Sequence, residues 1–592
     1  MKRKNRAASA TATSPDEKKK KVAHENSGEP STATTKSIDF SSPQRVVESL
    51  LPSISLETFF NEYWEKKPLF VKRDNADFYG SLFSKKDLEA VLKKKEILFT
   101  EDVSLMRYAE GKTELLNGAG RVNLKHVKAA GVAVQFHQPD RFKDELWRLL
   151  ESLEIYFTCL VGADAFIFQP GSQGLAPQFD ELETFIFQLE GKTKWKLFKP
   201  LQELSQEASP DLELSDLGEP SHEFDMEPGD ILYFPRGIVF FPTPIGEKDH
   251  TTYLAITTFQ ENSWGTLMNS ALSRAIEKAM ETDVEYRRGL PVNLSSFVGT
   301  GIHDQSETDD LTEENKDQEG DKKDGDGEEV KPPSPRTAFN YNLIKLLKGL
   351  IRHLNPDKAV DSMLRDFYAG RLPPFTEGSP KGKKKKTAPS DDSKVKLSHP
   401  DHVRVLIGDL SDGVPGNASD DELSESEEEE DENGSDEEEA EESEENEENK
   451  KEAKSKDAKK PQGKAKKTEK PKGTKAKNKK TEKDEEGDEE MQAEDEDEDE
   501  GSGNENDAFD NGDAGDEYIL VLHSVKNKRA SHMMGDPTPC STLKFPFRYK
   551  DALRQITADR DKFVTVSSLD LPEKERLSLV KSLWDQGLLE AE

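Results

Sequence analysis

The sequence predicts an α+β protein in which a β-sandwich or barrel of short strands is preceded and followed by helices. Between Phe166 and Phe259, runs rich in β-branched and aromatic residues alternate with turn residues, which is typical of closely spaced strands. On both sides of this part, apolar residues recur at the spacing of amphipathic helices. These two patterns place one β domain between two helical regions.

Four runs in the central part predict strands: Thr184 to Leu189, Lys194 to Phe198, Ile231 to Phe234 and Tyr253 to Phe259. Pro228-Gly229 stands directly before the third run and predicts a turn there. Further along the chain, Val403 to Ile407 and Tyr518 to His523 have the same strand character. We therefore expect strands outside the central domain as well.

Helices are predicted on each side of the strands. Ser84 and Asp87 have the spacing of a capping box ahead of an amphipathic pattern. A second helix is marked by Leu146, Leu149, Leu150 and Leu153. Residues Leu343 to Ile351 are so apolar that one helix face must be buried, either inside this chain or against a second copy. The last helix starts near Pro572 and ends at Gly587.

Charge is distributed in blocks along the 592 residues. The chain has 84 basic and 120 acidic residues, which gives a net charge of −36, and only 32% of its residues are hydrophobic. Residues 420–449 contain 20 acids and no Lys or Arg, 450–483 contain 16 Lys, and 484–500 contain 13 acids. Such tracts cannot bury enough apolar surface to fold, so they are expected to be disordered.

The composition also bears on the cellular compartment. Two cysteines far apart in sequence, Cys159 and Cys540, argue against a disulfide framework and indicate a reducing compartment. No apolar run approaches the length of a membrane helix, and the first residues lack the apolar core of a signal peptide. Lys2-Arg3-Lys4 and Lys18 to Lys21 instead resemble a two-part import signal. We expect a nuclear protein, and the alternating charged tracts favour the nucleolus.

Five motifs in order resemble one protein family. They are the run FNEYWEKKP from Phe60 to Pro68, Gly171-Ser-Gln-Gly-Leu-Ala-Pro177, Gln188-Leu-Glu-Gly-Lys-Thr-Lys-Trp195, Gly229-Asp-Ile-Leu-Tyr-Phe-Pro-Arg-Gly237 and Leu583-Trp-Asp-Gln-Gly-Leu-Leu589. This set resembles the nucleolar JmjC ribosomal oxygenases, which are also described as bifunctional histone-lysine demethylases and histidyl hydroxylases. The resemblance covers residues 43–300, 336–410 and 517–592.

The resemblance implies a double-stranded β-helix, or cupin-like jelly roll, followed by a helical dimerisation region and a C-terminal winged helix. It divides the chain into a polar tail at 1–42, a JmjC domain with its N-terminal helices at 43–265, a helical dimerisation region at 266–376 with a loop at 302–335, a linker and the start of the winged helix at 377–412, a charged insertion at 413–516, and the rest of the winged helix at 517–592. Homodimerisation is the function that the resemblance gives to the apolar helix.

The family's chemistry is oxidation that depends on Fe(II) and 2-oxoglutarate, with iron held by two His and one carboxylate. The first ligands of the family follow the Ala-Pro of the second motif, where this chain has Gln178 in place of His and keeps Asp180. The second family His follows Pro-Arg-Gly by three residues, and Phe240 stands there. A phenyl ring has no lone pair, and an amide is a poor substitute for an imidazole at Fe(II).

The 2-oxoglutarate positions of the family are also changed. Thr193 replaces the Lys that binds the distal carboxylate, and Asp164 replaces an Asn at the cosubstrate. Lys192 and Lys194 cannot take over the role of the Lys that the family has at the position of Thr193, because successive residues on a strand point to opposite faces. His222 and His250 are the nearest other imidazoles in sequence, and we expect both to be surface or structural residues.

Partners are predicted from charge and from the resemblance. The acidic tracts attract basic proteins such as histones or ribosomal proteins, unless they serve only as solubilising segments. The Lys-rich block lacks aromatic residues for base stacking, so it predicts salt-sensitive phosphate contacts with rRNA or DNA, or else a solvated linker neutralised by its acidic neighbours.

Two functions follow. The first is a catalytically degenerate JmjC protein, or pseudoenzyme, that binds basic ribosomal-protein or histone segments in chromatin or ribosome biogenesis. The second is an active dioxygenase, a ribosomal-protein histidyl hydroxylase or histone-lysine demethylase, as the resemblance implies. The changes at Gln178, Thr193 and Phe240 favour the first.

Overall fold

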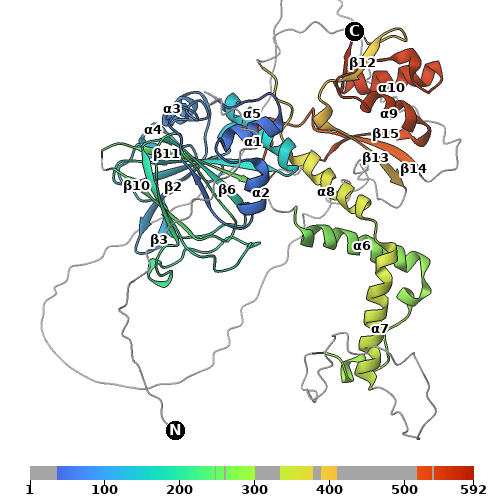
Figure 1. Ribbon diagram of the computed structural model, residues 1–592, viewed down its shortest axis with the longest axis horizontal. Coiled ribbons are helices and arrows are strands. Elements are labelled where there is room, and N and C mark those ends of the chain that lie inside the picture. Colours follow the sequence, from blue (N-terminus) through green and yellow to red (C-terminus); the bar gives the residue numbers. More distant parts are fainter. Residues whose placement is uncertain are drawn as a thin grey trace, which may run out of the picture. The chain divides into compact units, whose positions relative to one another are not determined.

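The computed structural model describes residues 37–246, 248–258, 262–299, 334–377, 388–409, 517–535 and 539–592 (Figure 1). Contacts between Cα atoms separate the chain into one unit made of 1–414 and 515–592 and a second unit at 415–514. The import signal, most of the loop predicted at 302–335 and the charged insertion lie outside the described residues. Predictions about those segments therefore stay predictions.

Two antiparallel sheets form the central β domain. The larger sheet runs in the order β1 (Leu69–Val71), β9 (Ile231–Phe234), β6 (Glu183–Glu190), β11 (Thr251–Thr258), β5 (Val161–Phe168), β4 (Ala133–His137), β2 (Val103–Ala109) and β3 (Lys112–Leu115). The smaller sheet has the order β10 (Phe240–Ile245), β7 (Lys192–Leu197) and β8 (His222–Met226). The four strands predicted in this part are confirmed, although the second and the fourth each begin two residues earlier. The second excludes Phe198, and Phe259, the predicted end of the fourth, lies outside the described residues.

Strand β5 shows how the larger sheet separates two cores. Ala163, Ala165 and Ile167 belong to the apolar cluster that the N-terminal helices share, whereas Phe168 belongs to a cluster with Trp195 of the smaller sheet. Because side chains alternate along a strand, Asp164 and Phe166 share the face of Phe168. One face of the sheet is therefore covered by helices, and the other faces the interior of the jelly roll.

Five helices contribute to the outer core: α1 (Pro43–Leu50), α2 (Leu56–Glu62), α3 (Lys85–Lys94), α4 (Leu124–Val127) and α5 (Asp144–Phe157) (Figure 1). Ser84 caps α3 by accepting a hydrogen bond from the backbone N–H of Asp87. The reciprocal contact of a full capping box is replaced by a bond from the Ser84 hydroxyl to the Asp87 carboxylate. The leucines predicted to be buried on α5 are buried.

The chain continues from β11 into helices α6 (Trp264–Thr282), α7 (Pro335–Leu350) and α8 (Pro356–Gly370). Helix α7 confirms the apolar helix predicted from Leu343, but within the described chain only Leu350 on it is buried. Leu343, Leu347 and the following Ile351 are 43%, 54% and 67% exposed. The apolar face predicted to be buried is thus largely uncovered in the single chain.

The C-terminal part contains two three-stranded sheets and two helices. Its elements are β12 (Lys394–Leu397) with β16 (Val564–Thr565) and β17 (Leu589–Ala591), then β13 (Val403–Asp409) with β14 (Glu517–His523) and β15 (Ser541–Pro546), and helices α9 (Lys550–Thr557) and α10 (Glu573–Asp585). Asp409 pairs with Glu517 at the end of the β13–β14 ladder. The charged insertion therefore connects two strands that are neighbours in one sheet.

Two further sequence predictions can be compared with the structure. Cys159 and Cys540 are both free thiols, in agreement with the absence of a disulfide framework. Among the described helices, none is long and apolar enough to cross a lipid bilayer.

Candidate functional site

Gln178, Asp180 and Phe240 lie together at the junction of the two sheets. The Gln178 N–H donates to the Phe240 carbonyl at 3.2 Å, and the Phe240 N–H donates back to the Gln178 carbonyl at 2.8 Å. Two residues on, the Asp180 carbonyl accepts a hydrogen bond from the N–H of Gly237 at 2.8 Å. The three positions that the resemblance assigns to iron are therefore brought together by backbone pairing.

Phe240 belongs to the apolar interior. Its side chain is 6% exposed, and its ring centre lies 5.3 Å from that of Phe234 and 6.1 Å from that of Trp195. Trp195 in turn packs edge-on against Tyr253 at 5.2 Å. At this spacing aromatic rings stabilise one another, so the ring of Phe240 serves as a core side chain.

Asp180 is held in an environment that disfavours its charge. Burial raises the pKa of its carboxyl group to about 6, and the nearby carboxylates of Glu181 and Asp164 contribute to the rise. A carboxylate that binds a metal has to be ionised. The surroundings of Asp180 supply negative charges where a metal site would supply imidazoles.

Thr193 is fully buried on β7, opposite Met226 on β8 and Pro244 on β10. Its hydroxyl has no hydrogen-bond partner among the described residues. Lys192 and Lys194 are paired on the outside of the sheet, Lys192 with Glu227 and Lys194 with acidic residues of β8. The alternation expected from the sequence is present, and no lysine points inward at this position.

Asp164 is held by two partners on β4. Gln135 donates from Nε2 to Asp164 Oδ2 at 3.0 Å, and Nδ1 of His137 lies 3.1 Å from Asp164 Oδ1. The other ring nitrogen of His137 is 3.1 Å from the hydroxyl of Ser104 on β2. This polar network faces the interior end of the jelly roll and fixes a carboxylate at a position where the resemblance implies a cosubstrate.

The sequence prediction missed Gln135, His137 and Ser104. His222 and His250 were considered because they lie near the motifs in sequence, yet His222 is exposed and His250 lies 3.2 Å from Glu190 near the other end of β6. The alternation of Gln135 and His137 on a short strand was the only signal, and nothing in the sequence pairs that strand with β5. Strand order is a tertiary property.

Together these residues do not fit the iron centre that the resemblance implies. Gln178 offers a weak oxygen, Phe240 offers no donor atom, and Asp180 is the one ionisable side chain among the three. In the described part of the chain, no group of three or more His, Cys, Asp or Glu residues is arranged to hold a metal ion. The chemistry that this arrangement supports is recognition of a cationic group by carboxylates.

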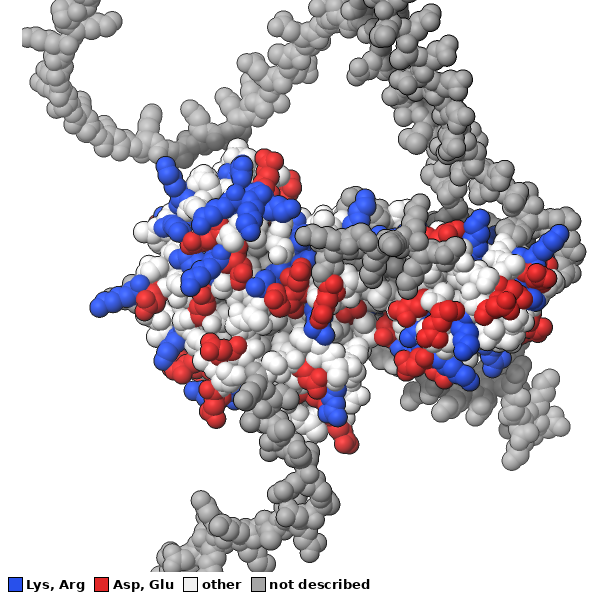
Figure 2. Space-filling view, turned by 90° about the horizontal axis from the view of Figure 1, so that it is seen from above, with Lys and Arg blue, Asp and Glu red and all other residues white. Residues whose placement is uncertain are grey.

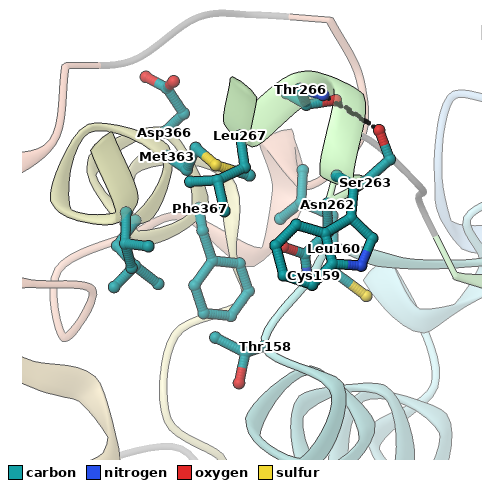
Figure 3. Close-up of a pocket in the computed structure, with 13 residues that line it drawn as sticks. Thr158, Cys159, Leu160, Asn262, Ser263, Thr266, Leu267, Met363, Asp366 and Phe367 are labelled. Carbon is teal, nitrogen blue, oxygen red and sulfur yellow. Dashed lines mark hydrogen bonds between the residues drawn. The ribbon is translucent and has the colours of Figure 1, made fainter. Parts of the chain in front are cut away.

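A cavity of about 530 Å³ lies outside the jelly roll (Figure 3). It is lined by the turn after α5 with Thr158, Cys159 and Leu160, by the start of α6, and by Met363 and Phe367 of α8. Burial raises the pKa of the Cys159 thiol to about 12, so the thiol is a neutral apolar lining group. None of the residues predicted for iron or cosubstrate lines this cavity.

Comparison with known proteins gives the same family as the motifs. Residues 135–264 match the family model described as JmjC domain. The chain is 30% identical over 569 residues to "Ribosomal oxygenase 2" of Bos taurus, which covers 93% of each chain, and 32% identical over 337 residues to "Ribosomal oxygenase 1" of Homo sapiens, which covers 56% of this chain and 48% of that protein.

Solved structures of the Escherichia coli ribosomal oxygenase YcfD are also similar. One, in complex with cobalt and 2-oxoglutarate, has a TM-score of 0.34 and 15% identity, covering 60% of this chain and 82% of that one. The JmjC model and the antiparallel sheets confirm the predicted α+β jelly roll. With 30% identity over 93% of both chains, this chain belongs to the ribosomal oxygenase family.

Proposed function

We propose that this member of the ribosomal oxygenase family binds basic segments of ribosomal proteins or histones in its jelly roll without oxidising them. The observation that carries the proposal is the pair Gln178 and Phe240, which lie opposite each other where the family has two imidazoles. Phe240 is integrated into an aromatic cluster rather than left beside an open coordination position.

Changes in the cosubstrate positions support the same proposal. Thr193 carries no charge to pair with a distal carboxylate, and Asp164 is itself a carboxylate in a network with His137 and Gln135. A dianion placed beside Asp164 meets repulsion at short range. Fe(II) and 2-oxoglutarate are thus cofactors of the family that this chain's own residues are poorly suited to hold.

The electrostatics of the same region favour a cationic ligand. Asp164, Asp180 and Glu181 form an acidic rim, and each of the other two raises the pKa of Asp180. Oε2 of Glu181 is buried without a hydrogen-bond partner among the described residues. A Lys or Arg side chain would supply both the positive charge and the donors that this rim is missing.

The second candidate is an active dioxygenase that hydroxylates a ribosomal-protein histidine or demethylates a histone lysine. It is favoured by family membership and by the retained Asp180. The experiment that decides is anaerobic purification of the full chain, addition of Fe(II) and 2-oxoglutarate, and measurement of bound metal and succinate. Stoichiometric iron with substrate-dependent succinate would falsify the binding-only proposal. Peptide binding with neither bound iron nor succinate formation supports it.

Three further properties belong to the same proposal. The protein acts in the nucleus, with the nucleolus favoured by its charged tracts, and the Lys-rich block at 450–483 contacts rRNA or DNA phosphates. The chain forms a homodimer through its helical region. The motivation for the dimer is an exposed apolar stripe along α6, made of Trp264, Met268, Leu272, Ile276 and Met280.

A further inference from the structure

Helices α3 and α4 lie side by side and together form a surface of exposed cations. Glu89 of α3 pairs at 3.0 Å with Lys128, which directly follows α4. Beyond the end of α3, Arg121 donates to the carbonyl of Lys95 at 3.1 Å. These contacts hold the segment of α3 against the segment of α4. We call the surface the basic patch, and its exposed cations without an acidic partner are Lys86, Lys93, Lys94, Lys95, Arg121 and Lys125.

The basic patch stays positive when all the acidic residues of its two segments, 84–97 and 120–130, are counted. The segments contain eight basic and three acidic residues, which leaves a net charge of +5. The acids are Asp87, Glu89 and Glu96. Asp87 and Glu89 form ion pairs with Lys143 and Lys128, whereas Glu96 is exposed and offsets one of the remaining charges. Figure 2 shows Lys and Arg side chains concentrated on one side of this part of the molecule.

Helix stability does not explain this accumulation of charge. Lys93 and Lys94 lie in the last turn of α3, where cations interact favourably with the helix dipole. Lys86 lies in the first turn, where the same dipole disfavours a cation. Burial lowers the pKa of Lys85, and the nearby charge of Lys128 contributes to that change. Like charges therefore already repel one another here, and an anionic partner relieves the repulsion.

The side chains between these cations restrict the class of the partner. None of the exposed large apolar side chains of the described chain lies in the two segments of the patch. The ring of His126 packs against Phe99 with 5.2 Å between ring centres and accepts a bond from the Asn123 N–H. Protein partners bind through buried aromatic or apolar anchors, and single-stranded nucleic acids bind through rings on which bases stack. Phosphates of a duplex need only positive charge.

The spacing of the cations also suits a duplex. Lys86 and Lys93 are seven residues apart on α3, so they lie on one face about 10 Å apart along the helix axis. A duplex carries one negative charge per about 1.7 Å of its axis, so this length of α3 faces about six phosphate charges. The net charge of −36 belongs to the whole chain, and physiological salt screens exposed charges beyond about 8 Å.

We propose that the basic patch binds the phosphates of a nucleic-acid duplex, without reading its base sequence. This surface is distinct from the jelly-roll interior and from the Lys-rich block, so the inference does not depend on the ligand of either. Because each contact between a cation and a phosphate releases a counterion, the affinity falls steeply as the salt concentration rises.

The first test uses the unmodified full chain. An acetylating reagent modifies exposed lysines, and mass spectrometry measures how strongly a short RNA duplex protects each of them. We expect protection of Lys93, Lys94, Lys95 and Lys125 at low salt and its loss at high salt. Protection that is confined to lysines outside the patch overturns the proposal. Equal protection by polyglutamate at the same charge concentration also overturns it, because the patch would then be a surface for acidic polypeptides.

The second test measures the salt dependence of binding by fluorescence anisotropy with the same duplex. The triple change Lys93→Gln, Lys94→Gln and Lys125→Gln removes three cations of the patch. It is expected to weaken binding by about 10-fold or more and to make the fall of log K with log salt less steep by about 2 to 3, because each phosphate contact contributes about 0.9 to that slope.

A matched variant removes the same charge elsewhere. Lys72→Gln, Lys112→Gln and Lys199→Gln change three exposed lysines outside the patch and are expected to leave the slope as it is. An equal change of slope in both triple variants, or an unchanged slope in the patch variant, contradicts the proposed surface.

Discussion

Gln178 and Phe240 exchange two backbone hydrogen bonds, so the two residues at which the resemblance implies imidazoles are directly opposite each other in an antiparallel bridge. The assignment of these two positions to iron can therefore be tested by introducing imidazole side chains at both of them. Changing both residues to His, together with Thr193→Lys, is expected to rebuild the ligand set around Asp180.

Metal binding is the first expected outcome. The triple variant is expected to bind Co(II) or Fe(II) more tightly than the wild type by more than about 100-fold. Mutation of residues that only hydrogen-bond to metal ligands already changes metal affinity by about 10–100-fold, and here the ligands themselves are restored. Calorimetry measures the affinity, and the single change Thr193→Lys is the matched control. A triple variant that folds, as judged by circular dichroism, and still binds no metal would place the iron positions elsewhere.

The acidic rim predicts how peptide binding depends on pH. Burial and the neighbouring carboxylates raise the pKa of Asp180 to about 6, so this group gains its negative charge as the pH rises through 6. Affinity for a Lys- and Arg-rich ribosomal-protein peptide is expected to increase between about pH 5 and pH 7, the range around that pKa.

The variant Asp164→Asn tests whether peptide binding depends on the acidic rim itself or only on the overall charge of the protein. It removes one carboxylate near Asp180 and is expected to lower the Asp180 pKa and to weaken the peptide by about 2- to 5-fold, the scale of one partly screened ion pair. Fluorescence anisotropy across pH measures both effects. Glu213→Gln, at an exposed residue outside the rim, is the control, and equal losses in the two variants speak against a specific rim.

His532 predicts a loss of stability in alkaline solution. Its Nε2 lies 3.0 Å from Glu154 and its Nδ1 lies 3.4 Å from Asp140, and all three side chains are fully buried. Burial opposes the charged ring, but the two carboxylates outweigh it and raise the pKa of His532 to about 9. The stabilisation is complete below the unfolded pKa near 6.5 and is lost as the pH rises through 9.

Urea unfolding at several pH values measures this contribution. His532→Gln is expected to reduce the free energy of unfolding by about 3 to 5 kcal/mol at pH 7, since it leaves buried carboxylates unpaired, and to flatten the alkaline decline. His222→Gln changes an exposed imidazole and leaves the profile as it is. An alkaline decline of unchanged size in the His532 variant contradicts this assignment.

The stripe on α6 predicts a dimer that one charge disrupts. Its apolar residues recur every four positions, while Ala271, Ala275 and Ala279 are buried on an adjacent face of the helix. Ile276→Glu is expected to convert the dimer into a monomer in light scattering, because an unpaired charge in an apolar interface is costly. Glu277→Lys, next to it in sequence and exposed, keeps the dimer. A wild-type chain that remains monomeric at high concentration contradicts this prediction.

Nuclear import is expected to depend on the N-terminal basic residues. Deleting residues 1–22 removes both Lys clusters and is expected to reduce nuclear accumulation of a fluorescent fusion in cells. Removing an equally long acidic stretch, residues 306–327, is the control. An unchanged distribution after the N-terminal deletion excludes this segment as the signal.

Local features of the fold could be predicted from the sequence because they depend on neighbouring residues. The Ser84 cap, the buried leucines of α5 and the outward direction of Lys192 and Lys194 all follow from helix or strand periodicity. The positions that the resemblance assigns to iron were taken from their offsets to Ala-Pro and Pro-Arg-Gly, and this assignment stays a prediction. The positions of β6 and β9 followed from the same kind of local pattern.

Features that depend on strand order or on a second chain could not be predicted in this way. The network of Ser104, His137 and Asp164 needs β2, β4 and β5 to be neighbours, and their side chains are far apart in sequence. Leu347 is exposed in the single chain, and the sequence left open whether a second copy covers its helix face, because an apolar pattern does not say which surface covers it. The partner of a buried cation, such as His532 with Glu154, is equally a product of tertiary packing.

The aromatic cluster around Phe240 has a consequence for the cell that makes this protein. In a jelly roll closed by coordinated iron, folding and metal supply are linked, since a bound ion stabilises the state that binds it. Here rings from both sheets hold the same end of the domain together. In the proposed binding protein, iron starvation or hypoxia would leave the folded population and its ligand binding unchanged.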